Sequence, residues 1–230
     1  MPLIPLRDNV PTRKFPIVTV ALIVANFLVW IFYQQRTGLE ASVTELGFQP
    51  CEVDETCPTT GQAWPVNTIT HMFSHASWDH VIFNMLPLWI FGNNIEDALG
   101  RFRYLAFYLL AGFAALAAQT AFTLATAGEQ AREIPMVGAS GAVFGIMAAY
   151  LVLLPHGKVL VAFFFFILRE LPAWLLIGFF VALELWQANF QLQHPPEGGG
   201  VAVFAHLGGA AFGIALVKLF QKRRPLQPTH

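Results

Sequence analysis

Four long stretches of this chain contain no Asp, Glu, Lys or Arg, and they limit the fold more than any other feature. They cover residues 15–33, 104–128, 134–157 and 198–217. A helix needs ~20 predominantly apolar residues to cross the hydrocarbon core of a bilayer. Only 12% of all residues are charged, about half of the ~25% that is typical of soluble domains. The sequence therefore predicts a protein that is embedded in a membrane.

Two further segments extend the count of spanning helices to six. Residues 81–95 are apolar, and a helix there can extend upstream through His80, while residues 171–190 are interrupted only by Glu184. Residues 159–168 are too short to span and are predicted to lie at the inner interface, because a seventh span would break the charge distribution described below. The fold class is thus an all-α bundle, with helices expected at about 15–34, 80–94, 102–127, 140–155, 172–190 and 201–219.

The chain is predicted to form one domain. Residues 1–14 are a short basic leader, 15–220 form the membrane domain, and 221–230 are a tail. The first apolar segment is long and no small-residue cleavage site closes it, so it is expected to be a permanent anchor rather than a signal peptide. A first outward loop, at about 35–67, is longer than connecting loops usually are, which indicates a functional or partly folded segment.

The distribution of charge predicts the orientation of the bundle. With six spans both termini lie on one side, and the bias of basic residues toward the cytoplasm makes that side the inner one. Arg36 and Arg132 are the exceptions, on the outer side. The other basic residues that flank the spans fall inside: Arg7, Arg13, Lys14, Arg101, Arg103, Lys158, Arg169, Lys218, Lys222, Arg223 and Arg224. Acidic residues fall outside: Glu40, Glu45, Glu52, Asp54, Glu55, Glu129, Glu133 and Glu197.

Both cysteines of the chain, Cys51 and Cys57, lie in the first outward loop. An oxidising exterior would permit a disulfide between them. Two unpaired thiols are the alternative, because two cysteines make a weak pattern. A zinc site is less favoured, since no further Cys or His lies nearby in this loop.

Two polar islands interrupt the apolar sequence, at Gly138-Ala139-Ser140-Gly141 and at Ala205-His206-Leu207-Gly208-Gly209. Polar groups inside a membrane are expensive, so each needs a reason. A serine hydroxyl is a poor nucleophile unless a base lies beside it, and imidazole titrates near neutrality. Ser140 and His206 are therefore predicted to be a nucleophile and its base.

Small residues on both helices explain how these two groups can meet. Residues four apart form a stripe that lets membrane helices approach closely. Ser140 and His206 fall together on the paired stripes, which favours a shared site over the alternative that the stripes only hold two helices together. The stripes consist of Gly141 and Gly145 on one helix, and of Ala205, Gly209 and Gly213 on the other.

The length of the helix after Ser140 predicts a pocket. A helix from Ser140 to the stop signal at Pro155 would be only ~23 Å long, because each residue adds about 1.5 Å. This length is shorter than the ~30 Å hydrocarbon core of a bilayer. If the inner end reaches the inner face, Ser140 lies below the outer surface, where irregular backbone must be buried in protein or line a wet cavity. We therefore expect a water-accessible pocket that opens outward, with Ser140 at its floor.

His80 and Asn84 are candidates for stabilising a tetrahedral oxyanion. They lie four residues apart, hence on one helix face, and both side chains can donate hydrogen bonds. The backbone N–H of Ser140, near a helix start, supplies a third donor. For Asn84, a structural hydrogen bond to a neighbouring helix is as favoured as a role at the oxyanion.

A metal site is not favoured. His71 and His75 have the spacing of a zinc-protease helix, but the glutamate that follows the first histidine in that motif is missing. These histidines are expected instead to organise hydrogen bonds around the pocket or to lie at the wet interface. The serine motif also differs from the nucleophile elbow of soluble hydrolases, which has a second glycine where this chain has Ala142. No metal and no cofactor is expected.

Taken in order, three motifs make the chain resemble the rhomboid intramembrane serine proteases over nearly its whole length. They are His80-Val81-Ile82-Phe83-Asn84, Gly138-Ala139-Ser140-Gly141, and Ala205-His206 followed by Gly209 and Gly213. The first outward loop departs from the family, because Trp64-Pro65 stands where members often carry Trp-Arg.

This resemblance implies a six-helix core and a Ser140–His206 dyad without an acidic third member. It also implies oxyanion contacts from His80, Asn84 and the Ser140 amide, and it points to the fifth helix as the one that moves to admit a substrate. One turn after Ser140, the ring of Phe144 can lie against His206. Gly138, Gly141, Gly145 and Gly209 are expected to support the site.

The expected function is that of an endopeptidase that cleaves transmembrane helices of other proteins near the outer membrane surface. The expected partners are these substrates and the lipid bilayer, and no nucleic acid is expected to bind. The family suggests substrates with small residues at the cut and a segment that unwinds easily. One alternative is a catalytically silent relative that binds or escorts membrane helices. A small channel or transporter is a third possibility, but such a protein would carry more intramembrane charge than this chain has. Glu184 is the residue that best supports it. The lack of an organelle-targeting leader predicts a prokaryotic plasma membrane.

Overall fold

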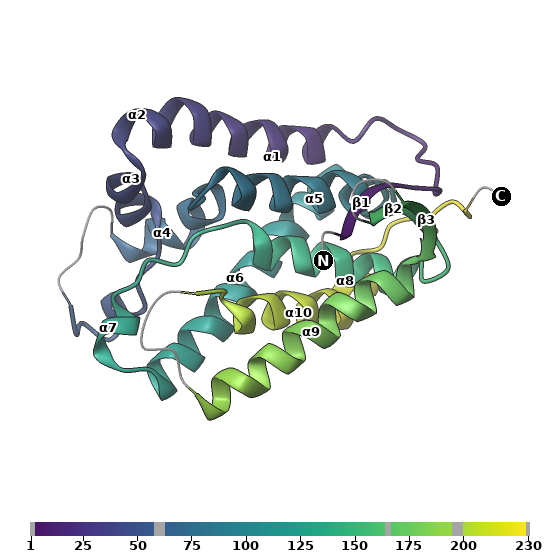
Figure 1. Ribbon diagram of the computed structural model, residues 1–230. Helices are drawn as coiled ribbons and strands as arrows, with labels where there is room; N and C mark the ends of the chain where they lie inside the picture. The colour runs from purple at the N-terminus through teal and green to yellow at the C-terminus, as the bar shows by residue number, and fades with distance from the viewer. Residues whose placement is uncertain (1–2, 58–62, 164–166, 195–199, 229–230) are drawn as a thin grey trace.

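The computed structural model describes residues 3–57, 63–163, 167–194 and 200–228 and is mostly helical (Figure 1). Residues 164–166 of the expected interfacial segment, Glu197 and the start of the last apolar window lie outside these ranges. The first helix is continuous through three parts, α1 (Ile17–Leu28), η1 (Val29–Gln34) and α2 (Gln35–Thr37). The other long helices are α5 (Trp78–Leu99), α6 (Arg101–Thr126), α8 (Ser140–Leu153), α9 (Ala173–Gln193) and α10 (Val203–Phe220).

Short elements form the loop after the first helix, which was predicted to face outward, and the linker that precedes α8. They lie together at one end of the bundle, and the two termini lie at the other end (Figure 1). The loop is thus partly folded, as its length predicted. These elements are α3 (Leu39–Leu46), η2 (Pro50–Glu52), α4 (Trp64–Thr70), η3 (His71–Phe73) and α7 (Glu129–Arg132).

Four helical segments of the described chain are long and apolar enough to cross a membrane: 17–37, 101–126, 173–193 and 203–220. The shorter α8 is also apolar. Large apolar side chains point outward, such as Phe102 (91% exposed), Leu219 (75%) and Trp186 (69%). An apolar surface of this kind is what a lipid-embedded protein presents. Six spans and the side on which the termini lie remain predictions.

A small antiparallel sheet corrects the all-α prediction. β1 (Leu3–Asp8), β2 (Lys158–Phe163) and β3 (Ile167–Pro172) pair in the order β1-β2-β3. The described parts of the segment expected at the interface are therefore two paired strands, and β1 from the basic leader pairs with the first of them. Val159 and Val161 are fully buried in the middle strand, in keeping with the preference of β-branched residues for sheets.

The helix predicted to end near Asn93–Asn94 continues to Leu99. Its last turns are held by polar contacts to other elements, because both oxygens of Glu96 accept hydrogen bonds, from the amides of Val18 and Thr19 and from the Thr19 hydroxyl. Gly100 then ends the helix with φ of 79°, a conformation that glycine adopts without strain.

Asp8 ties the sheet to two helices. Its Oδ2 accepts hydrogen bonds from Asn94 Nδ2 at 2.7 Å and from the Tyr150 hydroxyl at 2.8 Å. Burial nevertheless disfavours the charged form and raises the pKa of this carboxyl to about 6, against the lowering effect of these hydrogen bonds.

The pH dependence of stability should reflect this raised pKa. The folded state holds the Asp8 proton more tightly than the unfolded chain, so the penalty for ionising Asp8 is absent below about pH 4 and complete above about pH 6. The penalty corresponds to ~3 kcal/mol, from about 1.36 kcal/mol per pKa unit. Asp8→Asn should remove this penalty, because asparagine does not ionise. Thermal unfolding at pH 4.5 and 7.5 should show the variant gaining stability relative to the wild type as pH rises; parallel pH profiles would contradict this assignment.

Candidate active site

Ser140 and His206 form a hydrogen-bonded pair. Ser140 is the first residue of α8, and its Oγ lies 2.8 Å from Nε2 of His206, in the first turns of α10. The imidazole is largely buried, with 8% of the residue exposed. The two polar islands of the sequence thus meet at the same end of two adjacent helices, as the small-residue stripes predicted.

Glycines set the distance between these helices. A Cβ added at Gly209 would overlap the carbonyl oxygen of Gly141, and one at Gly213 would overlap that of Gly145. At Gly145 an added Cβ would lie 3.1 Å from the Gly209 oxygen. The backbones of α8 and α10 are therefore in direct contact, which only residues without side chains permit.

The imidazole of His206 is held on two further sides. The ring of Phe144 stacks on it, with centroids 4.4 Å apart and planes 8° from parallel. On the other nitrogen, Nδ1 lies 3.0 Å from Oε2 of Glu184, on α9. The contact with Phe144 matches the sequence-based expectation. The contact with Glu184 was missed, because the resemblance implied no acidic partner; a carboxyl inside an apolar helix was the available signal.

Gln119 is a second residue that sequence reasoning missed. Its Oε1 accepts hydrogen bonds from the backbone amides of Phe204 (3.1 Å) and Ala205 (3.2 Å), at the start of α10. These amides lie in the first turn, where N–H groups lack the usual partner four residues earlier in the helix; the Ala205 amide also donates to the Ala202 carbonyl at 3.0 Å. Gln119, from α6, thereby fixes the position of the turn that carries His206. An amide side chain within an apolar helix was the signal.

His80, Asn84 and Ser140 line the same pocket as His206. The Ala76 amide donates to His80 Nδ1 at 3.3 Å, so the ring proton is on Nε2, which is then a donor. Asn84 Nδ2 donates one hydrogen bond to the His80 carbonyl at 2.8 Å, and the amide has a second N–H. The donors expected around an oxyanion are thus gathered at one place.

Gly138 allows His80 to approach. Its φ of +119° is one that residues with a side chain rarely adopt, and an added Cβ would lie 2.6 Å from His80 Nε2. The Gly138 amide donates to the His71 carbonyl at 2.8 Å. His71 Nδ1 in turn lies 2.9 Å from the Asn67 carbonyl, so this histidine organises the backbone beside the pocket, as expected. Burial lowers the pKa of His71 to about 4 and keeps it neutral.

The pocket has a volume of about 660 Å³. Its polar groups lie among apolar side chains such as Phe83, Val143 and Met147. This size suits a short stretch of extended peptide better than a whole helix, which is ~10 Å in diameter.

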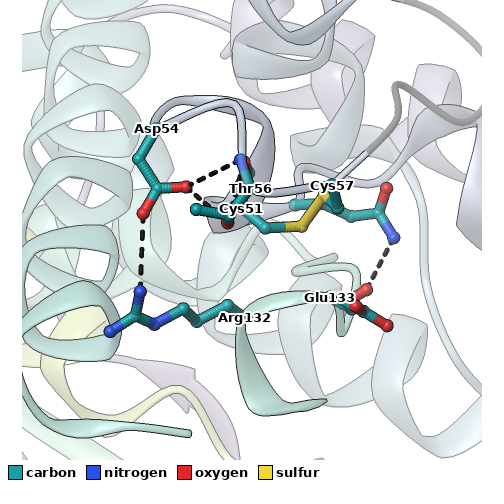
Figure 2. The surroundings of a disulfide bond; sticks show 7 residues. Cys51, Asp54, Thr56, Cys57, Arg132 and Glu133 are labelled. Carbon is teal, nitrogen blue, oxygen red and sulfur yellow. Dashed lines mark hydrogen bonds and ion pairs between the residues drawn. A yellow bond between two sulfur atoms is a disulfide. The ribbon is translucent and has the colours of Figure 1, made fainter. Parts of the chain in front are cut away.

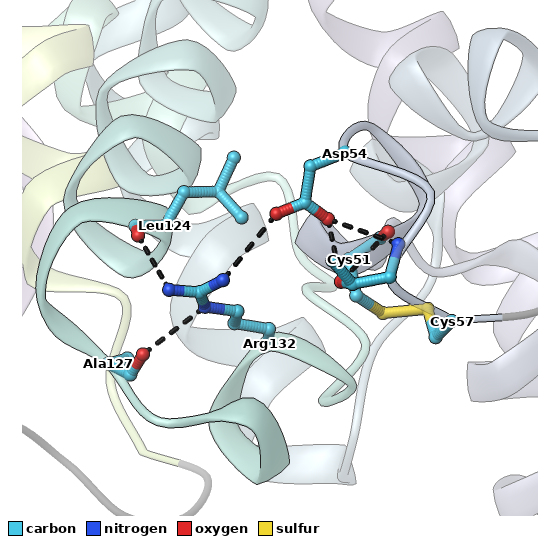
Figure 3. A network of polar contacts seen from close by, with 7 residues as sticks. Cys51, Asp54, Cys57, Leu124, Ala127 and Arg132 are labelled. Carbon is cyan, nitrogen blue, oxygen red and sulfur yellow. Dashed lines mark hydrogen bonds and ion pairs between the residues drawn. A yellow bond between two sulfur atoms is a disulfide. The ribbon is translucent and has the colours of Figure 1, made fainter.

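A disulfide joins Cys51 and Cys57 beside this pocket (Figure 2). Within the same loop, Asp54 forms an ion pair with Arg132 at 3.5 Å. Arg132 also donates to the carbonyls of Leu124 (2.8 Å) and Ala127 (3.2 Å), so that it connects the loop to the end of α6 (Figure 3). Ala127 and the neighbouring Pro50 and Ala131 line the pocket. Pro50, directly before Cys51, therefore joins the disulfide loop to the pocket rim.

Replacing both cysteines with serine should destabilise this rim. The disulfide closes a loop with a sequence separation of 6, for which the loss of chain entropy in the unfolded state corresponds to ~2 kcal/mol. We expect a lower midpoint of thermal unfolding and faster proteolysis near residue 54, with dithiothreitol producing the same change in the wild type. An unchanged midpoint in both experiments would contradict a stabilising disulfide.

A hydrogen-bonded serine–histidine pair within an apolar helical bundle defines a class, that of integral membrane proteins with the groups of a serine hydrolase. Residues 60–223 match the family model described as "Rhomboid domain". The match covers well over half of the chain, and the chain belongs to the rhomboid family.

Three relatives illustrate the relationship. Rhomboid protein 1, mitochondrial, of Saccharomyces cerevisiae is 29% identical over 65% of this chain and 40% of its own length. Presenilin-associated rhomboid-like protein A, mitochondrial, of Danio rerio is 33% identical over 67% of this chain and 38% of its own length. Rhomboid-like protein 11, chloroplastic, of Arabidopsis thaliana is 34% identical over 67% of this chain and 52% of its own length.

The chain thus spans between two fifths and about half of the length of these relatives. All three carry mitochondrial or chloroplastic names. They support an integral membrane protein, and they give no support to the expectation of a prokaryotic plasma membrane.

Proposed function

We propose that this protein is a serine endopeptidase that cleaves transmembrane segments of other membrane proteins through Ser140 and His206. The observation that carries the proposal is the 2.8 Å contact between Ser140 Oγ and His206 Nε2 in a pocket that His80 and Asn84 also line. Membership of the rhomboid family supports the same reaction class. The proposed site lies at the outer end of a bundle of six spans with both termini inside.

The first step is attack on the peptide carbonyl. The Ser140 Oγ–H bond breaks, its proton moves to His206 Nε2, and the oxygen forms a bond to the carbonyl carbon. The electron pair of the C=O bond moves to the oxygen. His80 Nε2–H, the second N–H of Asn84 and the Ser140 amide are the donors proposed for this oxyanion, a kind of contact that typically contributes ~100- to 1000-fold in rate per donor.

The second step releases the amine. The C–N bond breaks as His206 Nε2 returns its proton to the leaving nitrogen, which leaves an acyl ester on Ser140. Water then attacks the ester carbonyl carbon and gives its proton to His206 Nε2; the bond from this carbon to Ser140 Oγ breaks as His206 returns the proton to Oγ, which releases the carboxylic acid. Each step needs only the groups named here and water, which explains why no cofactor enters the proposal.

The size of the pocket bears on the substrate. A helix hides its carbonyls in hydrogen bonds, and it is too wide for a cavity of 660 Å³. The substrate segment must therefore unwind before Ser140 can attack, which favours transmembrane segments with weak helical propensity and small residues near the cut.

A reconstituted cleavage assay tests the function. The purified protein is placed in liposomes with a single-span substrate whose membrane segment contains Gly and Ala near one end, and the products are weighed by mass spectrometry. The expected result is two fragments cut within or beside the membrane segment, and none with Ser140→Ala. Tight binding of an intact substrate, equal for the wild type and Ser140→Ala, would instead favour a helix-binding protein without activity.

A further inference from the structure

Glu184 lies on the inward face of a helix that is otherwise exposed. The buried residues of α9 follow one stripe, formed by Ala173, Leu176, Ile177, Glu184 and Ala188. The next two positions, Leu185 and Trp186, are 56% and 69% exposed. The rotation of α9 about its axis is thus fixed by apolar contacts, and these contacts direct Glu184 into the bundle.

The carboxylate meets the imidazole on the side opposite to the serine. Glu184 Oε2 lies 3.0 Å from His206 Nδ1, while His206 Nε2 lies 2.8 Å from Ser140 Oγ. Both side chains of the Glu184–His206 pair are buried, 11% and 10% exposed. The carboxylate stands off the N–H direction, so the contact is close but poorly aligned for a hydrogen bond. Together, three helices bring a carboxyl, an imidazole and a hydroxyl into successive contact.

Glu184 differs from Glu96, the other carboxyl compared with it, in its hydrogen bonds. Glu96 accepts three hydrogen bonds, from two backbone amides and one hydroxyl, and so joins α5 to α1. Oε2 of Glu184 makes no well-aligned hydrogen bond to any described residue. A buried carboxylate is expensive unless it is paired, and the imidazole is the positive partner that forms when the reaction begins.

The chemistry of the base requires what this position supplies. His206 can accept the serine proton at Nε2 only in the tautomer that carries its hydrogen on Nδ1. A carboxylate at Nδ1 favours that tautomer and stabilises the imidazolium after proton transfer. We propose that Glu184 is a positioning residue that orients His206 and completes a Ser140–His206–Glu184 triad in this protein. This inference rests on the proposed function and extends the dyad that the family resemblance implied.

Two isosteric pairs of variants separate the charge of residue 184 from its packing. Glu184→Gln keeps the shape and removes the charge, and Glu184→Asp with Glu184→Asn repeats the comparison with a shorter side chain. We expect Glu184→Gln to lower kcat about 10- to 1000-fold with KM nearly unchanged, which is less than the ~10⁴-fold loss at a well-aligned acid. Glu184→Asp should be more active than Glu184→Asn. Leu185→Ala, on the exposed face, is the control and should retain wild-type rates.

A spectroscopic readout follows the tautomer directly. In ¹⁵N-histidine spectra, the signal lost in His206→Ala identifies His206, and we expect the wild type to show a protonated Nδ1 and a free Nε2. Glu184→Gln should show a mixture of tautomers. The inference is wrong if Glu184→Gln keeps the wild-type kcat, or if its loss matches a fall in the folded fraction while the spectrum is unchanged. Full activity of Ser140→Ala would instead remove the proposed function itself.

Discussion

Alanine at Ser140 or at His206 is expected to lower the rate of substrate cleavage by at least ~1000-fold, because each change removes a group without which the other cannot act. Ser140→Ala leaves no nucleophile. His206→Ala leaves a hydroxyl without a base, since Nε2 is the acceptor at 2.8 Å in the structure. Single-turnover cleavage of a reconstituted transmembrane substrate measures both rates.

The two losses should not add. Groups that act as a unit show about the same loss singly and together, so the double variant should match the single ones. Ser140→Ala should retain the midpoint of thermal unfolding within a few degrees, because it removes a single hydroxyl. His206→Ala also removes a buried ring that stacks on Phe144, so its rate is compared per folded molecule. Additive losses, or a residual rate within ~10-fold of the wild type, would contradict a shared site.

Gly209→Ala is expected to be the most destabilising small substitution at the site. Its Cβ would overlap the Gly141 carbonyl oxygen, which lies one residue beyond Ser140, so α8 and α10 must separate. Overpacking of this kind typically costs ~1–3 kcal/mol. A displacement of ~1 Å between reacting groups can lower the rate ~100-fold. Both the midpoint of unfolding and the cleavage rate should therefore fall.

Gly178→Ala is the matched control for this substitution. Gly178 also lies within a long helix, and nothing would contact an added Cβ within 4 Å. Since alanine favours helices over glycine by ~1 kcal/mol, this control should be as stable as the wild type or more stable. Equal behaviour of the two variants would show that close approach of α8 and α10 does not position the site.

Local patterns predicted most of the helices and the central pair. The charge-free windows mark helices because a membrane excludes charge, and the predicted bounds of the third and sixth helices differ from α6 and α10 by only one or two residues at each end. The Ser140–His206 contact was predictable because glycine stripes on two helices specify a close approach. Each charge-free window and each glycine stripe is a pattern of residues near one another in sequence.

Contacts between distant residues were not predictable where no sequence pattern marks both partners. β1 pairs with β2 from a remote part of the chain, so that Leu3 lies opposite Phe163. Nothing in residues 1–14 indicates this partner, and the sequence predicted only a short basic leader there. The approach of Glu184 to His206 depends on the rotation of α9, which apolar packing along its buried stripe fixes. The disulfide was an open alternative for a similar reason, since two cysteines in a loop do not specify their separation in space.

Covalent capture of Ser140 tests the central claim most directly. The pure protein in detergent is treated with a fluorophosphonate, which reacts only with an activated serine, and the modified residue is located by peptide mass spectrometry. We predict a single adduct on Ser140 that is absent in Ser140→Ala and strongly reduced in His206→Ala. No adduct on Ser140, or equal labelling in His206→Ala, would contradict the claim that His206 activates this hydroxyl.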